Sequence, residues 1–160
     1  MNTARIATIA TKLIVGKHMR MSLAQNHTGV LWQSFMSERY HITNQAGTDL
    51  YSIQLYEPSY FERFDFSNEF TKWAGVEVTH VPQELHGMEV LTIPAGLYAV
   101  FHHKGGPATA SDTFQYIFMK WLPTSGFHLD GRPHFEVLGS LYKNNHPDSE
   151  EDIWIPVAYN

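Results

Sequence analysis

The chain has 160 residues, 43% of them apolar and 14% aromatic, which is enough apolar material to bury the core of one domain. Its formal net charge is −5 and its basic residues are scattered, so direct binding to nucleic acid is not expected. The absence of cysteine excludes a disulfide scaffold, a thiolate nucleophile and a cysteine-ligated metal, and it fits a reducing, cytoplasmic setting.

The N-terminal segment MNTARIATIATKLIV is the one candidate for a targeting sequence. Thr8, Thr11 and Lys12 interrupt its apolar run and Arg5 supplies its one early charge, so a signal peptide is not expected. The chain also lacks a run of about 18 consecutive apolar residues, so a membrane span is not expected.

An internal repeat is visible along the chain and predicts the architecture. KLIVGKHMRMS at 12–22 resembles LTIPAGLYAVFHH at 91–103, with Gly16 aligned with Gly96 and an alternating strand after each glycine. We expect a helix to follow each of these strands. The repeat therefore begins with strand and helix in both halves.

The two helices differ in the clarity of their patterns. The first begins near Thr28 and carries Leu31 and Phe35 at a spacing of four residues. The second is predicted from apolar residues that recur at helical spacing: Phe114, Ile117, Phe118, Trp121 and Leu122. Leu31 and Phe35 match Phe114 and Phe118 in phase.

A pair of strands completes each half of the repeat. The matching segments are DLYSIQLYEP at 49–58 with PHFEVLGSLY at 133–142, and TKWAGVEV at 71–78 with DIWIPVAY at 152–159. This alignment places Trp73 opposite Trp154. Each half is thus strand, helix, strand, strand, with a further short strand before the helix.

The two halves, about 1–80 and 88–160, are expected to form a single domain over 1–160. A unit of about 80 residues with one helix leaves much of a sheet face bare, so neither half should fold alone. The sequence therefore predicts the α+β class: a tandem βαββ repeat that shares one curved antiparallel sheet, with both helices on one side and a central cleft near the pseudo-twofold axis.

A glutamate lies in the middle of the expected strand HFEVL, 134–138, whose apolar residues occupy both faces. A carboxylate removed from water is costly unless something compensates it, so Glu136 needs a partner, a proton or a ligand. The structural partners open to it are Arg132, Lys143 and a backbone amide. The repeat aligns Glu136 with Ser52, and a charge that only one half carries suggests a functional role for Glu136.

The sequence resembles the GyrI-like effector-binding domains, which also occur as C-terminal sensors of AraC-type and MerR-type multidrug regulators. The resemblance covers essentially the whole chain and rests on IPAGLYAVFHHKGG at 93–106, HFEVL with Glu136, and SEEDIWIPV at 149–157. It implies a tandem βαββ fold in which Glu136 lies at the bottom of an aromatic cleft and attracts lipophilic cations. The first strand begins close to Met1, which leaves no room for a helix-turn-helix, so we expect a stand-alone sensor.

The expected ligand is a small lipophilic cation with a wide aromatic body. Its charge would meet Glu136, and each aromatic face would add about 0.5–2 kcal/mol of cation–π attraction. Leu138 shares the parity of Glu136 and points to the same face. The remaining residues expected to line the cleft are Trp154, Phe114, Phe118, Phe35, Trp32 and Tyr51. For the first five of these, core packing is the alternative interpretation.

Catalysis is the main alternative function. Some members of the family resemble hydrolases that open strained electrophilic rings, and here Glu136 could act as a general base with Glu150 or Glu151 as a second carboxylate. Against this, HPDSEED at 146–152 has the composition of a solvated acidic turn. A non-enzymatic function is therefore favoured.

The sequence gives less support for binding of a protein, a haem group or a metal ion. Protein binding, as for members that inhibit a topoisomerase, would use the acidic run DSEED at 148–152, and a protein partner or a homodimer is left open. Haem binding, suggested by fold-level similarity, lacks an axial-ligand motif. The ten histidines form no HExxH, and the neighbours His102 and His103 point to opposite faces, so no metal and no cofactor is expected.

Overall fold

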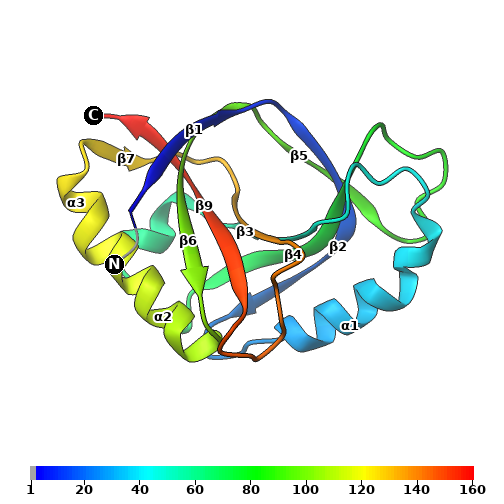
Figure 1. The fold of residues 1–160 in the computed structure, drawn as a ribbon, viewed down its shortest axis with the longest axis horizontal. Coiled ribbons are helices and arrows are strands. Elements are labelled where there is room, and N and C mark those ends of the chain that lie inside the picture. The colour runs from blue at the N-terminus through cyan, green and yellow to red at the C-terminus, as the bar shows by residue number, and fades with distance from the viewer. Residues whose placement is uncertain (1–2) are drawn as a thin grey trace.

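The computed structural model describes residues 3–160, whose strands form a nine-stranded antiparallel sheet (Figure 1). The first half contains β1 (Arg5–Ile9), β2 (Lys12–Ser22), α1 (Thr28–Glu38), η1 (Arg39–His41), β3 (Leu50–Leu55), η2 (Pro58–Phe61) and β4 (Glu69–Val78). The second half contains β5 (Glu89–Ile93), β6 (Gly96–Lys104), α2 (Pro107–Tyr116), the π-helical turn η3 (Ile117–Trp121), α3 (Leu122–Thr124), β7 (Phe127–Leu129), β8 (His134–Leu138) and β9 (Glu150–Tyr159). The predicted α+β class is confirmed.

The order of the strands shows the repeat directly. The sheet runs β1-β6-β9-β8-β3-β4-β2-β5, with β7 added beside β9, so β3 and β8 are neighbours at its centre. Strand β1 pairs with β6 of the second half, and β5 pairs with β2 of the first half. Each half therefore supplies an edge strand to the other half's side of the shared sheet.

The pseudo-twofold axis passes between Ser52 and Glu136, which are equivalent in the repeat and directly paired in the sheet. From this pair the register identifies the other equivalent positions. Tyr51 and Phe135 are equivalent, because each precedes one of these two residues by one position. Tyr51 pairs with Gly75, and Phe135 pairs with Trp154. The counterpart of Trp154 is therefore Gly75, and the predicted match with Trp73 is wrong. The error is two residues, which leaves a side chain on the same face of a strand and so leaves the hydrophobic pattern unchanged.

Gly16 and Gly75 lie opposite each other where β2 and β4 pair. A Cβ atom on Gly16 would lie 2.1 Å from the Ala74 carbonyl oxygen, and one on Gly75 would lie 2.8 Å from the Val15 carbonyl oxygen. Only glycine permits this close approach of the two backbones. The same register makes Val100 the counterpart of Gly16, so the predicted alignment of Gly16 with Gly96 is also wrong.

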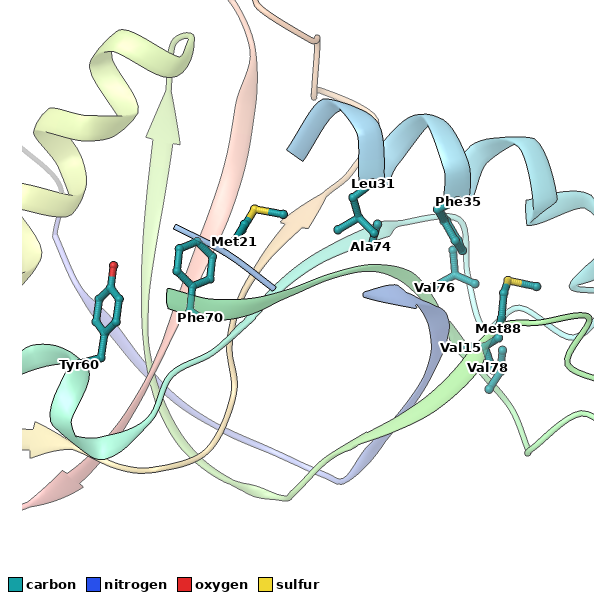
Figure 2. Packing of buried hydrophobic residues seen from close by; sticks show 10 residues of the cluster. All are labelled: Val15, Met21, Leu31, Phe35, Tyr60, Phe70, Ala74, Val76, Val78 and Met88. Atoms are coloured by element: carbon teal, nitrogen blue, oxygen red, sulfur yellow. The ribbon is translucent and has the colours of Figure 1, made fainter. Parts of the chain in front are cut away.

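Both helices cover the same face of the sheet. Paired residues of neighbouring strands share a face, and one such row runs from β4 to β6 through Ala74, Ser52, Glu136, Ile153 and Phe101. At one end, Leu31 and Phe35 of α1 point toward the sheet and pack with Ala74 (Figure 2). At the other end, Ile117 of η3 packs with Ile153 and Phe101. Glu136 therefore lies between two separate apolar clusters.

The opposite face of the sheet forms a third apolar cluster. Its buried members come from both halves: Ile14, Tyr51, Ile53, Trp73, Ile93, Tyr98, Val100 and Phe135. Residues of β1 and β5 also pack against this cluster, which shows that the sheet curls around this face as predicted. Within residues 3–160, none of the helices has the length and apolar character needed to cross a membrane.

Candidate functional site

Glu136 is buried at the centre of the face that carries the helices, with 7% of its surface exposed. Gln54 Nε2 donates a hydrogen bond to Glu136 Oε1 at 3.1 Å, and Lys72 Nζ lies 3.9 Å from the same oxygen. Of the structural partners considered as the alternative to a ligand, Arg132 pairs with Asp130 instead, and the lysine beside Glu136 is Lys72 and not Lys143. Gln54 pairs with Lys72 across β3 and β4, which places both on the face of Glu136.

Glu136 and Lys72 each reduce the energetic cost of burying the other's charge. Burial raises the pKa of Glu136, while the Lys72 charge and the Gln54 hydrogen bond act in the opposite direction. Burial lowers the pKa of Lys72, and the negative charges of Glu136 and Glu151 oppose that fall. The pair is therefore compensated, although its 3.9 Å separation exceeds hydrogen-bond length.

Glu151 brings a second carboxylate to the same environment. It lies on β9 two residues before Ile153 and therefore shares the face of Glu136. Burial, reinforced by the charge of Glu136, raises the pKa of Glu151 to about 7. The expected solvated turn is wrong here, because β9 already begins at Glu150. Glu150 belongs to the other face, where it lies 2.7 Å from His102 Nε2.

An aromatic group lies beside the carboxylates, around His134 on β8. Burial lowers the pKa of His134 to about 3, so its ring is neutral. Its ring centroid lies 4.9 Å from that of Tyr56, 5.6 Å from that of Phe61 and 6.2 Å from that of Phe118. Burial and then the charge of Glu136 raise the pKa of Tyr56. We call Tyr56, Phe61, Phe118 and His134 the aromatic wall.

The residues predicted to surround Glu136 fall into four groups, three of which lie on the face of the sheet that carries the helices. Leu138 and Phe118 lie on the side of Glu136: Leu138 is buried on the same strand face, and Phe118 belongs to the aromatic wall. Phe35 and Trp32 pack in the cluster beneath α1, where Phe35 is fully buried. Phe114 packs against the cluster beneath α2 and η3.

Trp154 and Tyr51 face the other way, and the structure does not bring them to Glu136. Because Glu136 pairs with Ile153 and Ser52, residues one position along the same strands point to the opposite face. There, both contact Phe135, with ring centroids 5.4 Å from Trp154 and 5.7 Å from Tyr51. For these two aromatic residues, core packing is the observed arrangement.

Sequence reasoning missed five residues around Glu136: Lys72, Gln54, His134, Tyr56 and Phe61. Gln54, Tyr56 and His134 share the parity of Ser52 or Glu136 along their strands, and this parity could have identified them. Phe61 lies in the short helical turn η2, where no strand or helix periodicity applies. Lys72 could be found only by knowing that β3 separates β4 from β8.

The central position, where the sequence predicted a cleft, is nearly closed to solvent. Gln54 and His134 are, like Glu136, less than a tenth exposed. Two surface pockets lie elsewhere, one along α2 and η3 and the other beside Gly96 and Arg132, and neither includes Glu136.

This sheet, with a buried carboxylate between two helices, defines the class of the protein. The chain belongs to the family of GyrI-like small molecule binding domains, whose sequence pattern matches residues 3–158, and the predicted resemblance is confirmed. It is also similar to the transcriptional regulator BrlR of Pseudomonas aeruginosa, with 28% identity over 156 residues. That match covers 96% of this chain and 55% of BrlR, so the chain spans about half the length of the regulator.

Solved structures share the fold at low sequence identity. SAV2435 bound to tetraphenylphosphonium superposes with a TM-score of 0.76 at 16% identity, covering 98% of this chain and 94% of that one. The C-terminal domain of EcmrR superposes with a TM-score of 0.75 at 14% identity, covering 100% of this chain and 99% of that one. These likenesses establish the architecture.

Proposed function

We propose that this protein binds lipophilic organic cations with an aromatic body, and that the positive charge of the ligand lies at Glu136. The observation that carries the proposal is the buried Glu136 carboxylate. Its Oε1 atom accepts a hydrogen bond from Gln54 and lies near the Lys72 ammonium. Its Oε2 atom accepts no hydrogen bond from residues 3–160. One carboxylate oxygen is thus free to meet an incoming group.

The charges around this oxygen favour a cation. When Glu136 and Glu151 are both ionised, two negative charges face the single positive charge of Lys72. A ligand with one positive charge balances this set, whereas an anion adds a third negative charge in a region of low dielectric. The site chemistry therefore selects ligands by the sign of their charge.

The aromatic wall supplies the other half of the recognition. Phe61 and Phe118 have ring centroids 5.1 Å apart and come from different segments, η2 and η3. Aromatic faces beside a carboxylate suit a cation whose charge is spread over an apolar body. The tetraphenylphosphonium bound to SAV2435, a protein of the same fold, is a ligand of this chemistry.

A sensor role fits this binding chemistry. BrlR is a transcriptional regulator that this chain matches over about half of its length, and we infer a comparable effector-binding role here. The net charge of −5 gives the domain itself little attraction for nucleic acid. Binding would be reported through a protein partner or another part of a regulator in the cytoplasm.

Hydrolysis is a second candidate, and Glu151 is the observation that favours it. A pKa of about 7 places this carboxyl at the protonation midpoint near neutral pH, which suits a general acid or base. Its charge is coupled to that of Glu136, so the two could divide the roles of holding and activating a water. The substrate would be a strained electrophilic small molecule.

A thermal-shift series of similar shape and different charge tests the binding function. The probes are tetraphenylphosphonium, the anion tetraphenylborate and the neutral triphenylphosphine oxide. At a concentration of about 100 times Kd, the cation should stabilise the protein by about 2.7 kcal/mol and raise Tm by roughly 5–10 °C. The borate should produce no comparable rise. Equal shifts from all three probes, or a shift with the borate alone, would refute a cation site.

A further inference from the structure

Lys72 is an unusual residue to find beside a cation site. It lies on β4, two strands away from Glu136. On β3 between them, Gln54 pairs with Lys72 and Ser52 pairs with Glu136, so the two charged residues lie diagonally across this strand. The Lys72 and Glu136 side chains are 12% and 10% exposed, the most enclosed ion pair that residues 3–160 form. By comparison, Lys12 and Glu77 approach to 3.3 Å with side-chain exposures of 24% and 23%.

The contacts of Lys72 are those of a loosely held charge. Its ammonium lies 3.9 Å from Glu136 Oε1 and donates no hydrogen bond to the rest of the described chain. A buried ammonium is normally fixed by several hydrogen bonds, because burial removes its hydration. Here Gln54, not Lys72, makes the hydrogen bond to Glu136. The lysine supplies charge to the site without being locked in place.

We propose that Lys72 is the resident counter-ion of the site: it neutralises Glu136 in the ligand-free protein, and a bound cation takes its place. The second half of this statement rests on the proposed function. A cation at Glu136 would lie within a few ångströms of the ammonium, where two positive charges repel strongly in a medium of low dielectric. Lys72 must therefore move away when the cation enters.

Glu151 is the acceptor toward which Lys72 can turn. The charge of Glu151 already acts on Lys72, where it opposes the fall in the lysine's pKa. The other ionisable groups affected by these carboxylates are Tyr56 and Tyr142, whose pKa values burial and the negative charges raise. His134 is neutral because burial lowers its pKa to about 3. Within residues 3–160, Glu151 is thus the further carboxylate whose charge acts on Lys72.

This exchange makes Lys72 a determinant of affinity and charge selectivity. A cation gains the Glu136 carboxylate but must displace the ammonium, so the lysine weakens binding of every cation by a similar factor. A neutral ligand leaves the pair in place and gains nothing when Lys72 is removed. An anion would be attracted by Lys72, which predicts the opposite effect of a lysine substitution.

Binding of tetraphenylphosphonium to variants at position 72 tests the exchange. At about pH 9, above the pKa of about 7 of Glu151, Lys72→Met should bind the cation at least about tenfold more tightly than the wild type. Lys120→Met, which removes an exposed lysine on η3, should bind it as the wild type does. Triphenylphosphine oxide should bind Lys72→Met and the wild type equally.

Lys72→Arg keeps the experiment decisive if Lys72→Met folds poorly. Arginine retains the charge and offers carboxylates two parallel donors, so this variant should bind the cation more weakly than the wild type. Lys72→Met with unchanged affinity, while the wild type binds the cation, would overturn the exchange and leave the proposed function intact. Failure of both proteins to bind any cation would overturn both.

A titration without ligand tests the resident pairing by itself. Carboxyl carbon NMR of the empty protein should show the Glu136 midpoint rising by at least about one pH unit in Lys72→Met, because the compensating charge is gone. The midpoint in Lys120→Met should stay at the wild-type value. An unmoved Glu136 midpoint in Lys72→Met would show that Lys72 is not its counter-ion and would overturn the proposal whatever the ligand.

Discussion

Replacement of Glu151 by glutamine should stabilise the ligand-free protein above neutral pH and have little effect in acid. In the wild type, burial and the charge of Glu136 raise the pKa of Glu151 from the ordinary 4.5 to about 7. The folded protein therefore holds this proton more tightly than the unfolded chain does. Its contribution to stability is full below pH 4.5 and is lost as the pH rises through about 7.

The size of the effect follows from the shift. At about 1.4 kcal/mol per pH unit, a rise of this extent corresponds to about 3 kcal/mol of lost stability in the wild type. Glu151→Gln lacks the ionisable group, so its free energy of unfolding should exceed that of the wild type by about this amount near pH 8. The buried carboxylate is thus a feature that the fold tolerates at a cost in stability.

Urea unfolding at several values between about pH 5 and pH 8 measures this difference. Glu62→Gln is the control, because this glutamate is exposed and forms no ion pair with the other residues of 3–160. The free energy of unfolding should decline less steeply with pH in Glu151→Gln than in the wild type or in Glu62→Gln. Parallel curves for the wild type and both variants would refute the assigned burial of Glu151.

Three further predictions follow from the fold and the site. Residues 1–80 and 88–160 expressed separately should be unfolded or aggregate, since β1 and β5 each pair with the other half; a soluble half with native-like circular dichroism would contradict this. Gly16→Ala should strongly destabilise the fold in urea, because its Cβ would lie 2.1 Å from the Ala74 carbonyl oxygen, whereas Gly29→Ala has open space and should not. A cationic aromatic ligand should be recovered unchanged by mass spectrometry; a product that Glu136→Gln or Glu151→Gln abolishes would favour the hydrolase.

The repeat could be predicted from sequence because periodicity reports local burial. Leu31 and Phe35 predicted the buried face of α1, and the alternating runs predicted the central strands. The register between strands could not be predicted, because a shift of two residues preserves the pattern of buried and exposed faces. Trp73 and Trp154 were therefore aligned although the sheet places Gly75 at the equivalent position.

In the candidate site, too, some residues could be predicted from the sequence and others could not. Glu136 was identifiable because a charge within an apolar strand contradicts its surroundings. Lys72 was not, because a lysine in the alternating run TKWAGVEV resembles an ordinary solvent-facing residue. Its position beside Glu136 depends on the strand order, with β3 between β4 and β8. Trp154 points to the face opposite Glu136, and this too could be known only from the pairing of β8 with β9.

Titration calorimetry of tetraphenylphosphonium against the wild type and Glu136→Gln, near pH 8, tests the central claim most directly. The glutamine keeps the shape of the side chain and removes its charge, so the cation should lose roughly 1.5–3 kcal/mol of binding free energy, which is about 10–150-fold in Kd. Triphenylphosphine oxide should bind both proteins alike. Equal affinity of the two proteins for the cation would show that Glu136 is a structural residue and not the site of the ligand's charge.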